Sequence, residues 1–166
     1  PEMAISEAGR CLQCKKPECQ LSGCPIGNDI KAWTKLIRNN KFAEAYLKIM
    51  ECNPFPALTG RVCAQENQCE GACAIPEKSN YEKQPLSIGL LERFIADWAA
   101  DHPKELKKAA DAHKKKLQKR PPTSDVMQAR TAAVSDKRVA VVGGGPSGMT
   151  VALLLARRGV NVTDRK

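Results

Sequence analysis

The chain has 166 residues, of which 42% are hydrophobic and only 4% aromatic, and its formal net charge is +9. This length suits one ordinary domain or two small ones, and so few aromatic residues predict a small aliphatic core that a bound inorganic centre would help to stabilise. No apolar run approaches the ~20 residues of a membrane span, and the N-terminus lacks the features of a secretory signal, so we expect no membrane span and a reducing, cytoplasmic location.

The first part of the chain, residues 1–98, carries all eight cysteines and shows three helical patterns. Apolar residues recur at helical spacing in three sets: Ile30, Trp33 and Ile37, capped by Asn28 or Asp29; Phe42, Ala45, Tyr46 and Ile49; and, after Ser87 as N-cap, Ile88, Leu91, Ile95 and Trp98. The segment NPFPALTG, residues 53–60, is expected to break the second helix with its prolines and glycine. We therefore predict a mainly α domain.

Residues 99–137 differ in composition from the helical part before them. The stretch KELKKAADAHKKKLQKR is rich in lysine and has mostly alanine on its apolar side, and PPTSD follows it. We predict an exposed helix and a linker here. Lysine runs of this kind usually form a solvated face, and a docking surface for an acidic partner is the alternative.

Residues 138–166 are predicted to form a truncated, Rossmann-like βαβ start of an FAD-binding domain. A β-branched run, Val139–Val142, leads into a glycine-rich turn and then a helix closed by Gly159, which is the context that a dinucleotide-binding G-x-G-x-x-G motif requires. Asp164 is the candidate acid for the ribose, 19 residues after Gly145. We expect this half-unit not to hold a dinucleotide alone, and its exposed strand edge to favour self-association.

The glycine-rich turn supplies the candidate cofactor-binding residues, which are Gly143, Gly144, Gly145, Pro146, Ser147 and Gly148. The first glycine of the motif permits the tight turn, the second lets the backbone approach a pyrophosphate, and the third lets the helix pack on the strand. The N-terminus of the helix then presents unpaired N–H groups to the phosphates. A βαβ turn without a ligand is the alternative.

The cysteines could hold disulfides, zinc or iron–sulfur clusters. Disulfides fit only a secreted chain. Structural zinc sites usually show two C-x-x-C pairs or added histidines, but this chain has one such pair, Cys11 and Cys14, and both histidines lie outside the cysteine region. Cys24 precedes a proline, as in ferredoxin-type sequences. Clustered loop cysteines ahead of a dinucleotide turn therefore favour iron–sulfur clusters.

Several motifs, in order, resemble one family of flavin-dependent enzymes. The segments EAGRCLQCKKPECQLSGCPIGNDIKAW, NPFPALTGRVC, CEGAC and SIGLLERFIAD, followed by VAVVGGGPSGM, look like the N-terminal part of the glutamate synthase small subunit. The matching region of dihydropyrimidine dehydrogenase is similar. The resemblance covers about residues 5–98 and 138–163, and it implies a helical domain with two 4Fe–4S clusters.

By resemblance, the metal ligands form two sets: Cys11, Cys14, Cys19 and Glu92 for the first cluster, and Cys24, Cys63, Cys69 and Cys73 for the second. The position of Glu92 alone favours a surface glutamate, and only the resemblance makes it a ligand. Two features depart from the family: the spacing from Cys19 to Cys24 is one residue longer than usual, and Cys52 stands where threonine is usual. We expect Cys52 to be a buried small hydrophobic residue without metal.

The resemblance also implies the function. In the parent enzyme, NAD(P)H would reduce FAD, and the clusters would carry electrons between FAD and a larger redox subunit or domain, as in glutamate synthase. No catalytic residue is assigned, and we expect the chain alone to be inactive. The alternatives are pyrimidine reduction of the dihydropyrimidine dehydrogenase type, a ferredoxin-like carrier, and a zinc module that binds nucleic acid. The last is disfavoured because no aromatic stacking platform is present, so no nucleic-acid partner is expected.

Overall fold

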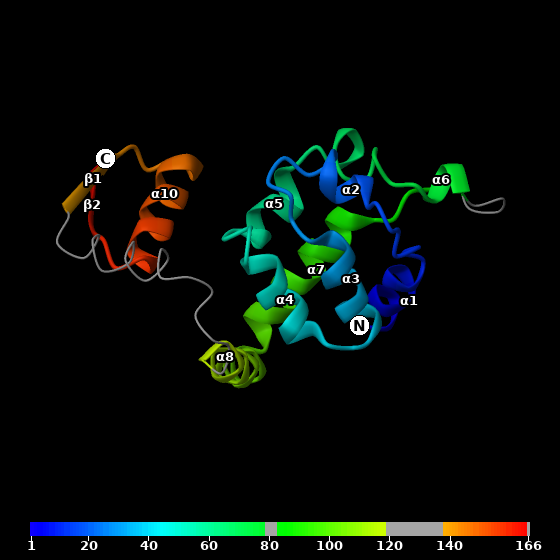
Figure 1. Cartoon of the computed structure of the whole chain (residues 1–166), viewed down its shortest axis with the longest axis horizontal. Helices are drawn as coiled ribbons and strands as arrows, with labels where there is room; N and C mark the ends of the chain where they lie inside the picture. Colours follow the sequence, from blue (N-terminus) through cyan, green and yellow to red (C-terminus); the bar gives the residue numbers. More distant parts are fainter. Residues whose placement is uncertain (79–82, 119–137, 166) are drawn as a thin grey trace. The chain divides into compact units, whose positions relative to one another are not determined.

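The computed structural model describes residues 1–78, 83–118 and 138–165. The chain divides into two compact units, Pro1–Lys114 and Lys115–Lys166. The first unit is helical, and the second contains a two-stranded parallel sheet with one helix (Figure 1). The prediction of a mainly α chain that ends in the start of a βαβ fold is therefore confirmed. Among the described residues, no helix is both long enough and apolar enough to cross a membrane.

The helices that begin in the first unit are α1 (Glu2–Gly9), α2 (Glu18–Leu21), α3 (Ile30–Arg38), α4 (Phe42–Met50), α5 (Pro56–Val62), α6 (Ile75–Lys78), α7 (Ile88–Asp101) and α8 (Pro103–Gln118), with a 3₁₀ turn η1 at Gln65–Asn67. Long loops separate α1, α2 and α3, and further loops lie between α5 and α7. Most of the cysteines lie in these loops.

Helices α3 and α4 form where the periodicity predicts them. Asp29 caps α3, because its Oδ1 accepts a hydrogen bond of 3.2 Å from the Ala32 N–H. The residues at helical spacing are buried in both helices, and the two helices pack on one another. Trp33, only 1% exposed, is the largest fully buried side chain. The core is otherwise mostly aliphatic, as the composition predicts.

Helix α7 is the central element of the first unit. It contacts α1, α4 and α5, and Figure 1 shows it running behind α3, α4 and α5. Its predicted stripe is buried at Ile88, Leu91 and Ile95. The ring of Phe42 on α4 meets Phe94 and Trp98 edge-on, each at a centroid distance of 5.4 Å. Three of the few aromatic side chains therefore join α4 to α7.

The expected break at residues 53–60 is only partly correct. Helix α4 ends at Met50, but α5 begins at Pro56 and runs through the glycine to Val62. Proline is favoured in the first turn of a helix because its missing N–H is unpaired there in any case. Gly60 is needed inside α5 because a Cβ at this position would lie 2.8 Å from the backbone nitrogen of Arg93 on α7.

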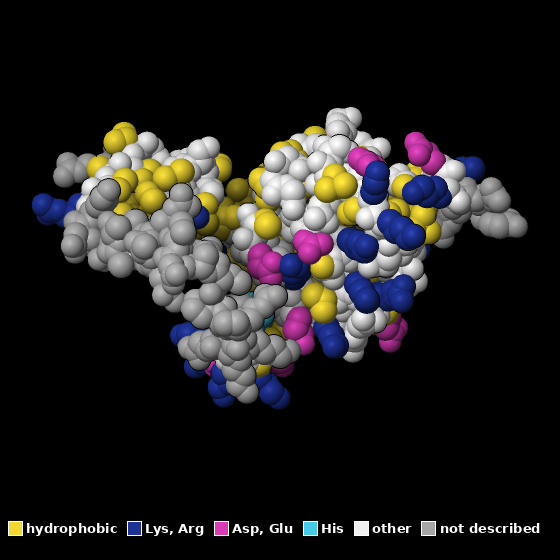
Figure 2. All heavy atoms as spheres, viewed as in Figure 1, with side chains coloured by type: hydrophobic (Ala, Val, Ile, Leu, Met, Phe, Trp, Pro, Cys, Tyr) yellow, Lys and Arg dark blue, Asp and Glu magenta, His cyan; other side chains and the backbone are white. Residues whose placement is uncertain are grey.

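The lysine-rich region begins with α8, which is exposed at its lysines up to Lys115. Lys and Arg side chains are also spread over the visible face of the first unit in Figure 2. The prediction of an exposed helix is therefore confirmed for its described part. The predicted linker falls on residues 119–137, which lie outside the described residues.

The second unit contains β1 (Arg138–Val142), α10 (Pro146–Arg157) and β2 (Asn161–Arg165). The strands are parallel, with Arg138 opposite Asn161 and Val142 opposite Arg165. A parallel pair joined by a helix is the predicted βαβ unit. Gly143 has a φ of +112°, and a Cβ on Gly148 would collide with the Gly143 carbonyl oxygen. Gly143 and Gly148 are thus required by the geometry of the turn.

Candidate metal centres

Four cysteines line one pocket of the first unit. Cys11, Cys14, Cys19 and Cys73 surround about 430 Å³ of empty space that is partly open to solvent. Cys11 and Cys14 lie in the loop after α1, Cys19 lies on α2, and Cys73 comes from the loop before α6. The other walls of this first pocket are mostly apolar and include Ile30, Ile75, Leu86 and Ile88.

Three cysteines and one carboxylate line a second pocket. Cys24, Cys63, Cys69 and Glu92 surround about 690 Å³ of empty space. Glu92 lies one turn into α7, and Cys63 directly follows α5. Gly23 allows the Cys24 loop to approach the Cys69 loop closely, because a Cβ at Gly23 would lie 2.9 Å from the Cα atom of Cys69. Each pocket thus has four candidate donors from at least three segments of the chain.

The two pockets group the candidate donors differently from the expected division. All eight predicted metal-binding residues line one of the two pockets, but Cys73 lies in the first and Glu92 in the second, the reverse of the expectation. The chain turns between Cys69 and Cys73, where the Cys73 N–H donates to the Glu70 carbonyl at 3.0 Å. This turn places two thiols that are close in sequence in different pockets.

The electrostatic neighbours of the thiols agree with this division. Burial raises the pKa of Cys19 to about 12, and the neighbouring thiols of Cys73, Cys11 and Cys14 add to the shift. Burial likewise raises the pKa of Cys69 to about 12, with contributions from Glu70, Cys24 and Glu92.

Without a cation, these buried thiols stay protonated, and metal binding would release their protons. Within the described residues, no three His, Cys, Asp or Glu side chains converge on one point as the ligands of a single ion do. In a 4Fe–4S cluster each ligand binds a different iron atom, so the ligands surround a volume instead.

Hydrogen bonds to sulfur orient several of these thiols. Gln13 Nε2 lies 3.3 Å from Cys11 Sγ and 3.1 Å from the Lys31 carbonyl, and its backbone has a φ of +51°. Lys31 Nζ in turn donates to the Cys14 carbonyl at 2.9 Å. The Leu86 N–H lies 3.4 Å from Cys73 Sγ. Nothing in the sequence predicts the roles of Lys31 and Leu86, whereas the position of Gln13 inside C-x-x-C could have indicated a contact with the thiols.

The second pocket contains polar groups beyond its four donors. The Asn28 N–H lies 3.4 Å from Cys24 Sγ. Asn53 and Thr59 both donate to Glu92 Oε1, at 2.7 and 2.6 Å. Burial raises the pKa of Glu92 above its ordinary value, although these two hydrogen bonds oppose the shift. Trp33 and Asn28 also line this pocket, and among the residues that the structure describes, the buried atoms Trp33 Nε1 and Asn28 Oδ1 have no hydrogen-bond partner.

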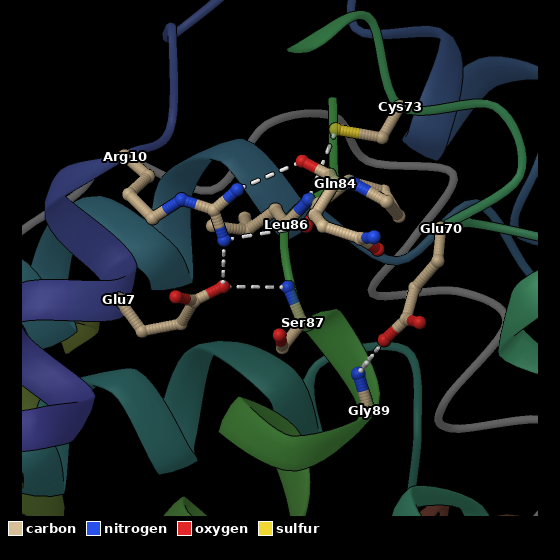
Figure 3. Close-up of polar contacts among 9 residues, drawn as sticks. Glu7, Arg10, Glu70, Cys73, Gln84, Leu86, Ser87 and Gly89 are labelled. Carbon is tan, nitrogen blue, oxygen red and sulfur yellow. Dashed lines mark hydrogen bonds and ion pairs between the residues drawn. The ribbon is translucent and has the colours of Figure 1, made fainter. Parts of the chain in front are cut away.

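An ion pair on α1 holds the segment that leads into α7 (Figure 3). Glu7 Oε1 accepts from Arg10 at 2.7 Å and from the Ser87 N–H at 2.8 Å. The guanidinium of Arg10 also donates to the Gln84 carbonyl at 2.8 Å. Because Leu86 lies between these anchored residues, the contact of its N–H with Cys73 Sγ depends on the same ion pair.

Two carboxylates, those of Glu7 and Glu70, accept hydrogen bonds from backbone N–H groups at the N-terminus of α7. Ser87 is the N-cap residue, as predicted, but its side chain makes no capping bond. Its N–H group donates to Glu7 instead, and the Gly89 N–H donates to Glu70 Oε1 at 2.9 Å (Figure 3). Negative charge at a helix N-terminus is favourable. Glu70 lies next to Cys69, so α7 is anchored to the loop that carries candidate donors of both pockets, Cys69 and Cys73.

Cys52 is exposed and lines neither pocket. The expectation of a buried small hydrophobic residue was therefore wrong. Cys52 lies just after the end of α4, in the turn before Asn53, where its side chain faces solvent while that of Asn53 is buried. Cys52 therefore belongs to neither group of candidate donors.

Comparison with known proteins identifies the family. The model of the family described as dihydropyrimidine dehydrogenase domain II, 4Fe–4S cluster, matches residues 1–104. The chain belongs to this family. An FAD-binding domain model matches residues 136–163 of this 4Fe–4S protein, which include the turn from Gly143 to Gly148. The predicted iron–sulfur and flavin chemistry is therefore confirmed at the level of the family.

Relatives of this 4Fe–4S protein share about a third of its residues. The glutamate synthase (NADPH) small chain of Escherichia coli is 35% identical over 164 residues, which is 98% of this chain and 29% of the relative. The same subunit of Azospirillum brasilense is 32% identical over 99% of this chain, which is 29% of the length of that subunit. AegA of Escherichia coli is 36% identical over 98% of this chain and 21% of its own. The chain spans less than a third of these relatives.

Replacement of Glu7 tests the anchor of α7. Glu7→Ala removes two charge-assisted hydrogen bonds and should lower the free energy of unfolding by about 1–2 kcal/mol, whereas Glu2→Ala, at an exposed position of the same helix, should change it by less than about 0.5 kcal/mol. The measurement is denaturant unfolding followed by circular dichroism under anaerobic conditions. Equal effects of the two variants would contradict the anchor.

The pH dependence of this difference follows from the pKa of Glu7. Burial raises that pKa, but the hydrogen bonds from Arg10 and Ser87 outweigh burial and hold it below 4.5. A lowered pKa in the folded state gives stability that is present above the unfolded value and lost as the pH falls through the folded value. The difference in free energy of unfolding between the wild type and Glu7→Ala should thus stay constant from about pH 8 to about pH 5.

Single cysteine replacements test the division of the donors. Cys73→Ala and Cys11→Ala should each lose about four iron atoms per chain, those of the first pocket, and retain the cluster of the second pocket. Cys69→Ala should instead lose the cluster of the second pocket and retain that of the first. Iron analysis and electron paramagnetic resonance spectra of the reduced proteins distinguish the two species. If Cys73→Ala matched Cys69→Ala and differed from Cys11→Ala, the division would be wrong.

Proposed function

We propose that the chain is the electron-transfer part of an NAD(P)H-dependent, FAD-containing iron–sulfur oxidoreductase of the glutamate synthase small-subunit type. In this proposal, two 4Fe–4S clusters relay electrons between FAD and a redox centre on a larger partner subunit or domain. The observation that carries the proposal is that the eight predicted donors, seven thiols and Glu92, line two pockets, four in each, and that a glycine-rich dinucleotide turn follows them in the chain.

The chemistry of the donor sets fits iron–sulfur clusters. Seven of the eight candidate donors are thiols, which are the usual ligands of 4Fe–4S clusters. The cluster in the first pocket would be bound by Cys11, Cys14, Cys19 and Cys73, and the cluster in the second pocket by Cys24, Cys63, Cys69 and Glu92. When bound, such clusters accept and release single electrons. The mostly apolar walls would limit access of water to the sulfurs.

An unpaired buried atom gives independent support for a ligand in the second pocket. The indole N–H of Trp33 is buried without a partner, which ordinarily costs about 1–3 kcal/mol. Trp33 lines the pocket together with the three cysteines. A cluster sulfur is an acceptor that this donor lacks in the protein itself, and hydrogen bonds to sulfur are a recognised means of setting cluster potentials.

The turn from Gly143 to Gly148 would contact the diphosphate of FAD. A Cβ on Gly144 or Gly145 would meet no atom within 4 Å, so the backbone there is open to a ligand. The N-terminus of α10 follows at Pro146, and its N–H groups favour an anion. We assign residues 1–98 to the cluster-binding domain, 99–137 to the linker and 138–166 to the start of the FAD domain.

The substrate and the partner are inferred from the relatives. Relatives named as glutamate synthases include NADPH-dependent small chains and an NADH-dependent enzyme of Schizosaccharomyces pombe. A large subunit of glutamate synthase is therefore the preferred partner. Pyrimidine reduction is the second candidate, because the family description names dihydropyrimidine dehydrogenase. Both functions use the same two pockets in the same way.

Metal analysis tests the proposed relay. Protein purified without oxygen should contain about eight iron and eight acid-labile sulfide per chain, which corresponds to two 4Fe–4S clusters. Cys52→Ser is the matched control and should leave both values unchanged, because Cys52 is exposed outside the pockets. Stoichiometric zinc without sulfide would contradict the proposal.

A further inference from the structure

The carboxylate of Glu92 is held by two neighbouring side chains in the second pocket. Asn53 Nδ2 lies 2.7 Å and Thr59 Oγ1 lies 2.6 Å from the same oxygen, Oε1. Both distances are in the short range that is typical of hydrogen bonds to a charged group. Within the described part of the chain, no hydrogen bond to Oε2 is found. The two oxygens of this carboxylate therefore have different surroundings.

The orientation of the Asn53 amide is fixed by its own contacts. Asn53 is 4% exposed, and its Oδ1 accepts a hydrogen bond of 3.0 Å from the Phe55 N–H. The flipped amide would place an NH₂ group against that N–H donor, so Nδ2 must face the other way. Its two hydrogens then reach Glu92 Oε1 and Thr59 Oγ1, the latter at 2.6 Å. Both ends of the Asn53 side-chain amide are therefore engaged in hydrogen bonds.

The hydroxyl group of Thr59 has one hydrogen and two possible acceptors. The Phe55 carbonyl lies at 3.0 Å, and Glu92 Oε1 lies at 2.6 Å. The carboxylate is both nearer and charged, and it is therefore the preferred acceptor. Since Oγ1 accepts from Asn53 at the same time, the three side chains form one closed set of hydrogen bonds.

The approach of α5 to α7 makes this contact possible. Thr59 precedes Gly60, whose missing side chain lets α5 lie against the backbone of Arg93, the residue after Glu92. Asn53 comes from the turn between α4 and α5. Residues from three segments thus meet at a single oxygen of the Glu92 carboxylate, and Glu92 lines the second pocket together with Cys63 and Cys69.

We propose that Asn53 and Thr59 are positioning residues that hold Oε1 of Glu92, so that Oε2 alone is presented to the iron of a cluster in the second pocket. The inference rests on the proposed function, which makes Glu92 a ligand. Two hydrogen bonds on Oε1 fix the rotamer of Glu92 and make the carboxylate a monodentate donor. Partners of this kind orient metal ligands, and their loss typically costs 10–100-fold in metal affinity.

Replacement of the Thr59 hydroxyl tests the proposal. Thr59→Val keeps the shape of the side chain and removes only the donor. In the anaerobic holoprotein it should speed the loss of iron from the second cluster to a chelator on the order of tenfold and shift the electron paramagnetic resonance signal of that cluster. The signal of the first cluster should be unchanged. Thr59→Ser, which restores a hydroxyl, should behave as the wild type does.

Two further variants make the test specific. Thr150→Val is the matched control, because Thr150 donates to the carbonyl four residues earlier, at 2.7 Å, as Thr59 can, and no hydrogen bond joins it to a carboxylate within the described part of the chain. Asn53→Asp replaces the Nδ2 donor by an oxygen of nearly the same size. It should labilise the second cluster as Thr59→Val does, and it serves as the test if Thr59→Val folds poorly.

The outcomes separate this inference from the function on which it rests. Faster loss of iron from the second cluster alone in Thr59→Val, with wild-type behaviour of Thr59→Ser, supports the positioning role. Wild-type behaviour of Thr59→Val and Asn53→Asp, or equal loss from both clusters, overturns it while the iron–sulfur function stands. A wild type that holds zinc in place of two clusters overturns both. The cluster that remains in Cys69→Ala identifies which signal belongs to the first pocket.

Discussion

The gathering of seven thiols and one carboxylate, all buried or partly buried, in a small helical domain is the constraint on which the rest of the structure depends. Deprotonation of such groups in low dielectric is unfavourable, and each neighbouring anion makes it more so, as the raised pKa values of Cys19 and Cys69 show. Only a bound cationic centre can stabilise the anionic forms together. With so few aromatic side chains, the domain also gains from a centre that joins its loops.

Helix α7 connects this constraint to the ordinary core of the protein. One face packs on α1, α4 and α5, and its N-terminus is fixed by carboxylates from α1 and from the cysteine loop. Glu92, one turn later, borders the second pocket. The same helix therefore sets the position of a candidate ligand and, through the segment before it, the donor to Cys73 Sγ. A substitution at the N-terminus of α7 or at Glu92 should therefore alter the geometry of a pocket.

Much of this arrangement could be predicted from the sequence because it is local. Spacing predicts α3, α4 and α7, and the glycine motif predicts the βαβ unit, since both depend on residues near one another. The assignment of Cys73 and Glu92 to pockets could not be predicted in the same way. It depends on a turn between Cys69 and Cys73 and on the approach of α5 to α7, which only the tertiary fold determines. The exposure of Cys52 was missed for the same reason.

The most direct test of the account is the position of iron relative to the eight donors. An anaerobic crystal structure, with anomalous scattering measured at the iron edge, would show it. The account predicts two 4Fe–4S clusters, one bound by Cys11, Cys14, Cys19 and Cys73, and the other by Cys24, Cys63, Cys69 and one oxygen of Glu92. A single cluster, a zinc ion, or Cys73 bound to the same cluster as Cys69 would contradict it.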